Sequence, residues 1–106
     1  MNLAYQIKIL PSAIQDAKNC YEFLAVSSPE KASKWIDSLM DAFTSLEVMP
    51  RRCPIARETD FIGLEIRCLV YRKHYRILYS VDDSIVLIYH IRHTSQEFMS
   101  AEDFLT

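Results

Sequence analysis

The hydrophobic pattern of this 106-residue chain changes from a helical to a strand-like period close to its single glycine, Gly63. Between residues 12 and 50, apolar side chains recur every three or four positions, as they do along one side of an α-helix. From residue 64 to residue 92 they recur at every second position, which is typical of β-strands. A helical segment followed by a segment of strands predicts an α+β domain.

The helical segment is predicted to form a hairpin of two amphipathic helices. An alternating strand over residues 4–10 ends at Pro11, and Ser12 with Gln15 fits a capping box at the start of the first helix. The second helix has two possible starts, either a box from Ser27 to Glu30 or a cap by Ser28 with proline in the first turn. Pro50 ends it. The predicted buried positions are Ile14, Ala17, Tyr21, Leu24, Ala32, Trp35, Ile36, Leu39, Phe43 and Leu46.

Three strands are predicted after the loop-like residues 51–63, over residues 64–71, 75–81 and 85–92. Residues 82–84 form the hairpin loop between the last two. With the N-terminal strand they make a four-stranded, mainly antiparallel sheet in one domain that spans residues 1–106, with the helical hairpin on one face. The residues expected to face the helices are Leu64, Ile66, Cys68, Val70, Tyr75, Ile77, Tyr79, Val81, Ile85, Leu87, Tyr89 and Ile91.

The other face of this sheet is expected to mix cationic and aliphatic side chains, with Arg76 directly opposite His90. Apolar side chains rimmed by charge mark an interaction site. The alternative is that residues 93–106 fold back over the face and pack Phe98, Phe104 and Leu105 against it. The residues assigned to this face are Arg67, Leu69, Tyr71, Arg76, Leu78, Ser80, Val86, Ile88, His90 and Arg92.

Composition excludes several classes of protein. No signal peptide and no membrane span can be recognised, and three cysteines without a C-x-x-C spacing predict reduced thiols and a cytosolic protein. His90-x-x-His93 lacks further ligands at metal-binding spacing, and one glycine cannot make a phosphate-binding loop, so neither a metal nor a cofactor is expected. The net charge is −2, but residues 51–92 carry 8 basic and 5 acidic groups, which places the basic charge in the central, strand-rich part of the chain.

Several segments form an ordered pattern over about a hundred residues. They are Tyr5-Gln-Ile-Lys-Ile with Pro11 and Ala13, Ser28-Pro29-Glu30-Lys31-Ala32 with Trp35, Leu46 ahead of Pro50, Gly63-Leu-Glu-Ile-Arg67-Cys-Leu-Val, Tyr75-Arg-Ile-Leu-Tyr79-Ser-Val-Asp82-Asp83 and Ile88-Tyr-His90-Ile-Arg92. In this order, the chain resembles the RelE/ParE toxin family of type II toxin–antitoxin (plasmid-stabilisation) systems. The resemblance implies a cytoplasmic toxin that inhibits growth and is neutralised by a cognate antitoxin in a heterotetramer or a larger complex.

The family divides by target. ParE-like members poison DNA gyrase, whereas RelE-like members cut mRNA in the ribosomal A site. Cleavage of that kind needs cations for the phosphate and groups that move protons. By resemblance, Arg67 and Arg92 match the family's strand arginines. His90 and His93 are candidate acid–base groups of a ribonuclease, because histidine is the side chain best matched to neutral pH. The RelE branch has a catalytic tyrosine at the position of Phe98, and a phenyl ring cannot move a proton.

Two features favour a ParE-like gyrase poison that carries out no chemistry. One is Phe98, and the other is the resemblance of the residues at the helix start, 28–32, and in the strands, 67–70 and 75–79, to those of ParE. A ribosome-dependent mRNA endonuclease, or a degenerate toxin that only binds antitoxin, stay open as alternatives. The antitoxin is expected to lie across the mixed face or along the helical hairpin, with acidic side chains against the arginines. The residues predicted to bind the partner or target are Arg67, Leu69, Arg76, Leu78, Ile88, His90 and Arg92.

Overall fold

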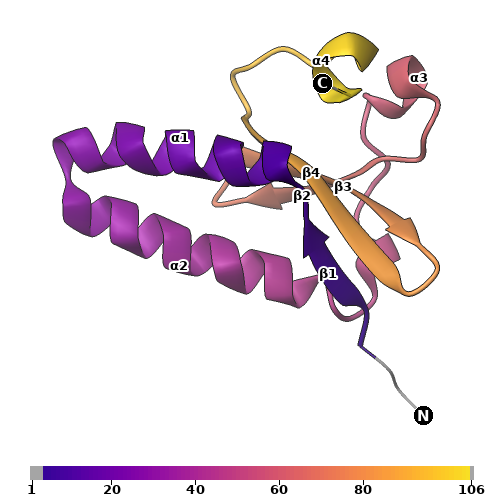
Figure 1. Ribbon diagram of the computed structural model, residues 1–106, viewed down its shortest axis with the longest axis horizontal. Coiled ribbons are helices and arrows are strands. Elements are labelled where there is room, and N and C mark those ends of the chain that lie inside the picture. Colours follow the sequence, from indigo (N-terminus) through magenta and orange to yellow (C-terminus); the bar gives the residue numbers. More distant parts are fainter. Residues whose placement is uncertain (1–3, 106) are drawn as a thin grey trace.

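A computed structural model describes residues 4–105 of the chain. Two long helices lie against one face of a four-stranded sheet, and two short helices, α3 and α4, lie side by side at the other end of the molecule (Figure 1). The predicted α+β fold with its helical hairpin is therefore confirmed. The elements are β1 (Gln6–Ile9), α1 (Pro11–Ser27), α2 (Pro29–Ser45), the 3₁₀ turn η1 (Pro50–Arg52), α3 (Thr59–Ile62), β2 (Arg67–Tyr71), β3 (Tyr75–Asp82), β4 (Ile85–His93) and α4 (Ala101–Leu105).

The two long helices begin in different ways. Helix α1 begins at Pro11, whose fixed φ suits the first helical position, and no side chain caps it. The predicted capping box at Ser12 is wrong, because the Ser12 hydroxyl donates to the carbonyl oxygen of Tyr89 in β4, 2.7 Å away. Helix α2 follows the second of its two predicted starts, since the Ser28 hydroxyl accepts a hydrogen bond from the amide of Lys31 at 3.2 Å.

The sheet has the strand order β1-β4-β3-β2, with β1 parallel to β4 and the other pairs antiparallel. A β-bulge interrupts the pairing of β3 with β4. Tyr79 is paired with Ile88 and Leu78 with His90, so Tyr89 is an extra residue on β4. An extra residue reverses the faces of all side chains on one side of it.

The register of β4 corrects two predictions, because the hairpin loop is one residue shorter than the predicted 82–84, with Asp82 paired with Ile85, and the bulge adds a further shift beyond Ile88. Val86 and Ile88 face the helices and are fully buried, although alternation had placed them on the other face. Arg76 lies opposite Arg92 instead of His90.

The faces of β2 were also predicted the wrong way round. Leu69 is paired with Ile77 and packs in the helix-side core, as does Tyr71. Ile66 and Cys68 lie on the other face of the sheet, in a second core.

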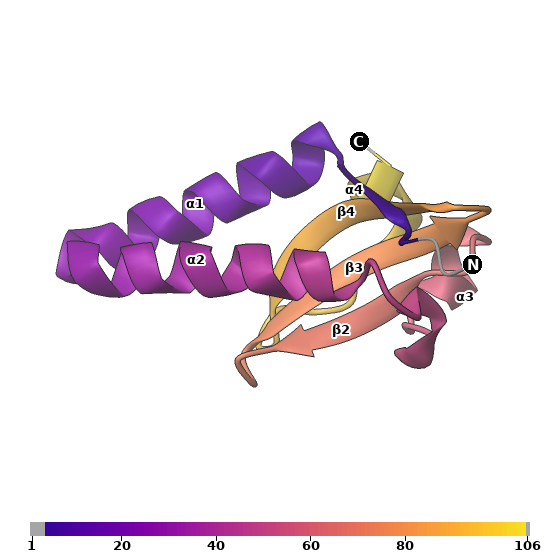
Figure 2. The same ribbon diagram turned by 90° about the horizontal axis from the view of Figure 1, so that it is seen from below.

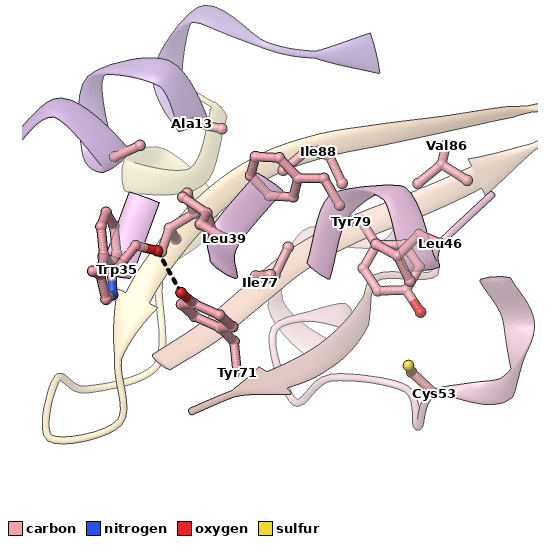
Figure 3. Packing of buried hydrophobic residues seen from close by; sticks show 13 residues of the cluster. Ala13, Trp35, Leu39, Leu46, Cys53, Tyr71, Ile77, Tyr79, Val86 and Ile88 are labelled. Atoms are coloured by element: carbon pink, nitrogen blue, oxygen red, sulfur yellow. Dashed lines mark hydrogen bonds between the residues drawn. The ribbon is translucent and has the colours of Figure 1, made fainter. Parts of the chain in front are cut away.

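The main core fills the space between the helical hairpin and the sheet (Figure 3). Two buried tyrosines tie it to the backbone of the helical half: the Tyr71 hydroxyl donates to the carbonyl oxygen of Trp35 at 2.5 Å, and that of Tyr79 donates to Pro50 at 2.6 Å. The buried members of this core are Ala13, Ala17, Trp35, Leu39, Phe43, Leu46, Cys53, Tyr71, Ile77, Tyr79, Val86, Ile88 and Ile91.

A second, smaller core covers the opposite face of the sheet. The chain's own C-terminal segment supplies Met99 and Phe104, which pack on Leu78 from β3. The tail therefore folds back over the sheet as in the alternative prediction, but of the three residues predicted to pack there only Phe104 is buried, whereas Phe98 and Leu105 are 47% and 63% exposed. The buried members are Ala56, Ile66, Cys68, Leu78, Met99 and Phe104.

Candidate functional site

Arg67 lies on the helix side of the sheet. It is paired with Tyr79, whose side chain belongs to the main core. Its guanidinium donates to the carbonyl oxygens of Arg51 at 3.0 Å and Cys53 at 2.7 Å, and to the carboxylate of Glu65 at 2.9 Å. Only 16% of the Arg67 side chain is exposed. This arginine therefore holds the loop after α2 against the sheet.

Arg76 lies on the opposite face and forms a buried ion pair with Glu58. The two guanidinium nitrogens donate to the two carboxylate oxygens at 2.9 and 2.7 Å, and the amide of Met99 donates to the same carboxylate at 3.1 Å. Burial by itself would raise the pKa of Glu58, but the hydrogen bonds from Arg76 and Met99 outweigh burial and lower that pKa from its ordinary value. The ion pair connects β3, the loop before α3 and the C-terminal tail.

His90 holds the tail at a second point. Its Nδ1 lies 2.8 Å from a carboxylate oxygen of Asp16, and its Nε2 lies 3.0 Å from the carbonyl oxygen of Phe104. Both partners accept hydrogen bonds, so the protonated imidazolium fits this position. Burial opposes that charge, yet the hydrogen bonds to Asp16 and Phe104 dominate and raise the pKa of His90.

Arg92 holds the same segment at a third point, because its guanidinium donates to the carbonyl oxygen of Glu97 at 2.7 Å. Phe98, the residue at the position of the RelE-branch tyrosine, lies beneath the guanidinium groups of Arg57 and Arg76, 5.4 and 5.0 Å from its ring centroid.

The predicted open surface on the sheet therefore does not exist as a single site. Arg67 and Leu69 face the helices, whereas Arg76, His90 and Arg92 face the other way. Leu78 is buried under the tail, and Ile88 is buried under the helices. The prediction that these residues share one exposed face is wrong, because both faces of the sheet are covered by the chain's own segments.

The three residues proposed for ribonuclease chemistry are separated in the same way. His90 and Arg92 share a face, and Arg67 lies on the other one. A single phosphate cannot contact both arginines through this sheet. The arrangement gives no geometric basis for a joint catalytic role of Arg67 and Arg92.

An apolar groove between α1 and α2, with a volume of about 310 Å³, remains open. Ile14 on α1 and Met40 on α2 line it, and 56% and 45% of these residues are exposed. Lys18 supplies the one charged side chain of the lining. The lining is Ile9, Ala13, Ile14, Ala17, Lys18, Tyr21, Ile36, Met40 and Phe43.

Sequence reasoning included the helical hairpin as an alternative partner surface, but it placed Ile14 in the buried stripe. The signal was present, because apolar side chains on α1 outnumber the positions that the sheet can cover. Only Ala13 and Ala17 of α1 are buried. A helix with more apolar positions than buried ones leaves an apolar strip open to a partner.

Two further observations concern chemistry and membranes. Within residues 4–105, no group of His, Cys, Asp and Glu side chains is arranged to hold a metal ion. No helix in that range is long and apolar enough to cross a membrane.

Comparison with known proteins identifies the family. Two solved structures share the fold: a chain of the chromosomal ParDE toxin–antitoxin system of Pseudomonas aeruginosa (TM-score 0.70, 20% identity, covering 85% of this chain and 96% of that chain), and one of the RelBE2 toxin–antitoxin complex of Mycobacterium tuberculosis (TM-score 0.56, 23% identity, covering 91% and 98%). No curated protein matches the chain. The family model of the ParE toxin of type II toxin–antitoxin systems, parDE, matches residues 7–98, and the chain therefore belongs to the ParE toxin family.

Proposed function

We propose that this protein is a growth-inhibiting toxin of the cytoplasm that poisons DNA gyrase and is neutralised by a cognate antitoxin. The observation that carries the proposal is the match of the ParE toxin model over residues 7–98. Phe98 supports it, because this ring cannot perform the proton transfer of a tyrosine. The separation of Arg67 from Arg92 by the sheet supports a binding protein over an enzyme.

The test of the target uses purified toxin and purified gyrase. We expect the toxin to inhibit the supercoiling of relaxed plasmid, and induction in cells to change plasmid topology. Unchanged supercoiling at a molar excess of folded toxin would contradict the proposal.

The likeness to the RelBE2 structure keeps a ribosome-dependent mRNA endonuclease as the second candidate. Mapping transcript ends after induction separates the two, because only the endonuclease produces cuts within translated codons. Normal growth on strong induction would instead indicate a degenerate toxin that acts only as an antitoxin-binding module.

The apolar groove between α1 and α2 is the surface we assign to the antitoxin. Its lining is apolar except for Lys18, and it runs between two helices, which suits the apolar side of an amphipathic helix from the partner. The arginines of the sheet already bind the chain's own carbonyl and carboxylate groups. An acidic residue of the antitoxin is therefore expected near Lys18 and not at Arg67, Arg76 or Arg92.

This assignment is tested by Met40→Asp, which puts a charge into the groove at a position that is already 45% exposed. We expect the variant to fold normally and to bind the antitoxin at least about tenfold more weakly, since a buried unpaired charge is costly. The matched control is Val70→Asp, an exposed apolar position on β2 outside the groove. Equal antitoxin affinity of the Met40→Asp variant and the wild type would exclude the groove.

A further inference from the structure

A second hollow, of about 480 Å³, opens between α1 and the ends of β3 and β4. Three ring side chains line it: Phe23 from α1, Tyr75 from β3 and His93 from β4. Phe23 is 78% exposed, which is unusual for a side chain of this size and polarity. The lining also offers the side-chain amides of Asn19 and Gln96, and it contains no carboxylate.

The ring of His93 is held at one nitrogen. Its Nδ1 accepts a hydrogen bond from the amide of Ser95 at 3.0 Å and lies 2.7 Å from the Ser95 hydroxyl, which leaves Nε2 as the second polar atom of the ring. Tyr75 packs edge-on against it, with centroids 5.3 Å apart, and the ring of His74 lies parallel to it at 6.0 Å. The hollow thus combines flat rings with groups that donate and accept hydrogen bonds.

Two cations lie in the turn between β2 and β3, which leads directly into Tyr75, although neither of them lines the hollow itself. Arg72 and Lys73 are both exposed, and among the described residues neither makes an ion pair. The Arg72 guanidinium donates to the hydroxyl of Ser38 on α2, at 3.3 Å, and its charge also acts on Tyr75 in the hollow. The guanidinium groups of Arg67, Arg76 and Arg92 in the sheet, by contrast, donate hydrogen bonds to carboxylate or carbonyl oxygens. Figure 2 shows this turn projecting from the end of the sheet that lies away from α3.

The backbone of the turn is strained as well. Arg72 and Lys73 have φ values of 50° and 65°, the left-handed region in which side chains other than those of Gly, Asn and Asp are disfavoured. Asn-Gly would satisfy this conformation without strain. Backbone strain of this kind is often found at functional sites, and it motivates the hypothesis that the two cations bind a ligand.

We propose that this hollow binds an unpaired nucleotide of a single-stranded nucleic acid. The base would stack on Phe23 and the neighbouring rings, the amides and His93 Nε2 would meet its polar edge, and Arg72 with Lys73 would hold the adjacent phosphates. Rings beside cations are the combination by which proteins bind single strands, because every base has a flat face and every linkage has a charge. A duplex hides its base faces and does not fit this surface.

The nucleotide hollow shares no lining residue with the apolar groove assigned to the antitoxin. The groove uses the side of α1 that carries Ile14 and Lys18, and the hollow uses the side that carries Asn19 and Phe23. The inference goes beyond the gyrase proposal and does not depend on it, since binding is measured without gyrase or antitoxin.

The binding test uses fluorescence anisotropy of labelled oligo-dT and oligo-rU of about 12 nucleotides, a length within the range of known single-strand sites. We expect saturable binding of at least one of the two, which also identifies the sugar preferred. A duplex of equal length should bind more weakly. Absence of saturable binding, equal binding of the duplex, or equally effective competition by polyglutamate would overturn the proposal.

Substitutions then locate the site. Phe23→Ala removes an exposed ring and should weaken binding about fivefold or more, as the loss of one stacked base does. Val26→Ala, an 89% exposed position on the same helix outside the hollow, should leave binding unchanged. Equal effects of the two variants would show that the hollow does not bind the base.

Substitutions in the turn test the phosphate contacts with a variant that is expected to be more stable than wild type, so weaker binding cannot be explained by unfolding. Arg72→Asn with Lys73→Gly should raise the melting temperature by about 4 °C or more, because the strain is relieved. The same variant should weaken binding and flatten the log–log dependence of affinity on salt by about 1.4, the value for two lost phosphate contacts on a single strand.

Lys8→Ala with Arg51→Ala removes the same charge from β1 and η1, outside the hollow, and should not change that slope beyond a small long-range effect. A more stable turn variant with unchanged affinity and salt slope would overturn the assignment of the phosphates to Arg72 and Lys73.

Discussion

Replacement of Glu58 by glutamine should destabilise the protein strongly, although the two side chains have the same shape. Glu58 is fully buried and accepts three hydrogen bonds, two from Arg76 and one from the amide of Met99. Glutamine removes the charge and turns one acceptor into a donor. The Arg76 guanidinium would then face an amide in a site that water does not reach freely.

The size of the effect follows from what is left behind. Removal of one charge from a buried ion pair costs about 3–5 kcal/mol, because the remaining charge has lost its compensation. Since 11% of the Arg76 side chain is still exposed, we expect the lower end, about 3 kcal/mol. This is a large share of the roughly 5–15 kcal/mol by which a domain of this kind is stable.

The dependence on pH has a defined sign. The pKa of Glu58 is lower in the folded protein than the ordinary value, so the ion pair contributes fully above that ordinary value. The contribution is lost as the pH falls through the folded pKa. Urea denaturation should therefore show a difference in the free energy of unfolding between wild type and Glu58→Gln that is large at neutral pH and smaller in acid.

Two controls define the result. Glu65→Gln removes the exposed carboxylate partner of Arg67 and should cost no more than about 1 kcal/mol. Glu58→Met with Arg76→Met removes both charges and should cost less than Glu58→Gln alone. A loss below about 1 kcal/mol in Glu58→Gln, or a gap that does not change with pH, would refute the assignment of a buried, compensated charge.

Three further changes test other parts of the fold. His90→Gln should lower the free energy of unfolding most at about pH 6, because the contribution of the imidazolium is complete only below the pKa of histidine in the unfolded chain. The difference from wild type should shrink as the pH rises through the raised pKa of His90 in the folded protein. A difference that grows with pH in urea denaturation would contradict this. Leu78→Asp should cost more than about 4 kcal/mol and prevent folding, since Leu78 is fully buried under the tail; a folded variant by circular dichroism would show that the tail is not packed there. Ser28→Ala should lower stability by about 1 kcal/mol through loss of the cap on the Lys31 amide, and an unchanged denaturation midpoint would exclude that cap.

The local elements could be predicted from the chain because local rules decide them. The change of period near Gly63 distinguishes helices from strands, and the cap at Ser28 follows from short-range backbone chemistry. The predicted end of the second helix at Pro50 was wrong, because α2 ends at Ser45 and Pro50 begins the separate turn η1. The face of β3 was also correct, since Ile77 and Tyr79 pack in the main core as expected, and Leu78 between them packs on the other face. The short helices α3 and α4 were missed, because each is too short for a periodic pattern.

The faces of β2 and β4 could not be predicted in this way. Alternation of apolar and polar residues identifies the buried face only when the other face of the strand is exposed to solvent. Here the C-terminal tail covers the second face, so both faces are buried. Cys68 and Leu69 are neighbours that both look apolar, and which of them faces the helices depends on segments far along the chain. The bulge at Tyr89 adds a one-residue shift that no local pattern marks.

The amino-acid sequence by itself therefore determined the α+β architecture, the helical hairpin and the ParE family, since these follow from period, capping and an ordered set of residues. Only the tertiary structure decided which surfaces stay open. From the sequence alone, Arg76 and Arg92 were expected to be available to a partner, but in the folded chain they bind Glu58 and the carbonyl oxygen of Glu97. Whether a charge is available to a partner depends on which distant groups reach it first, and that is settled by packing and not by spacing along the chain.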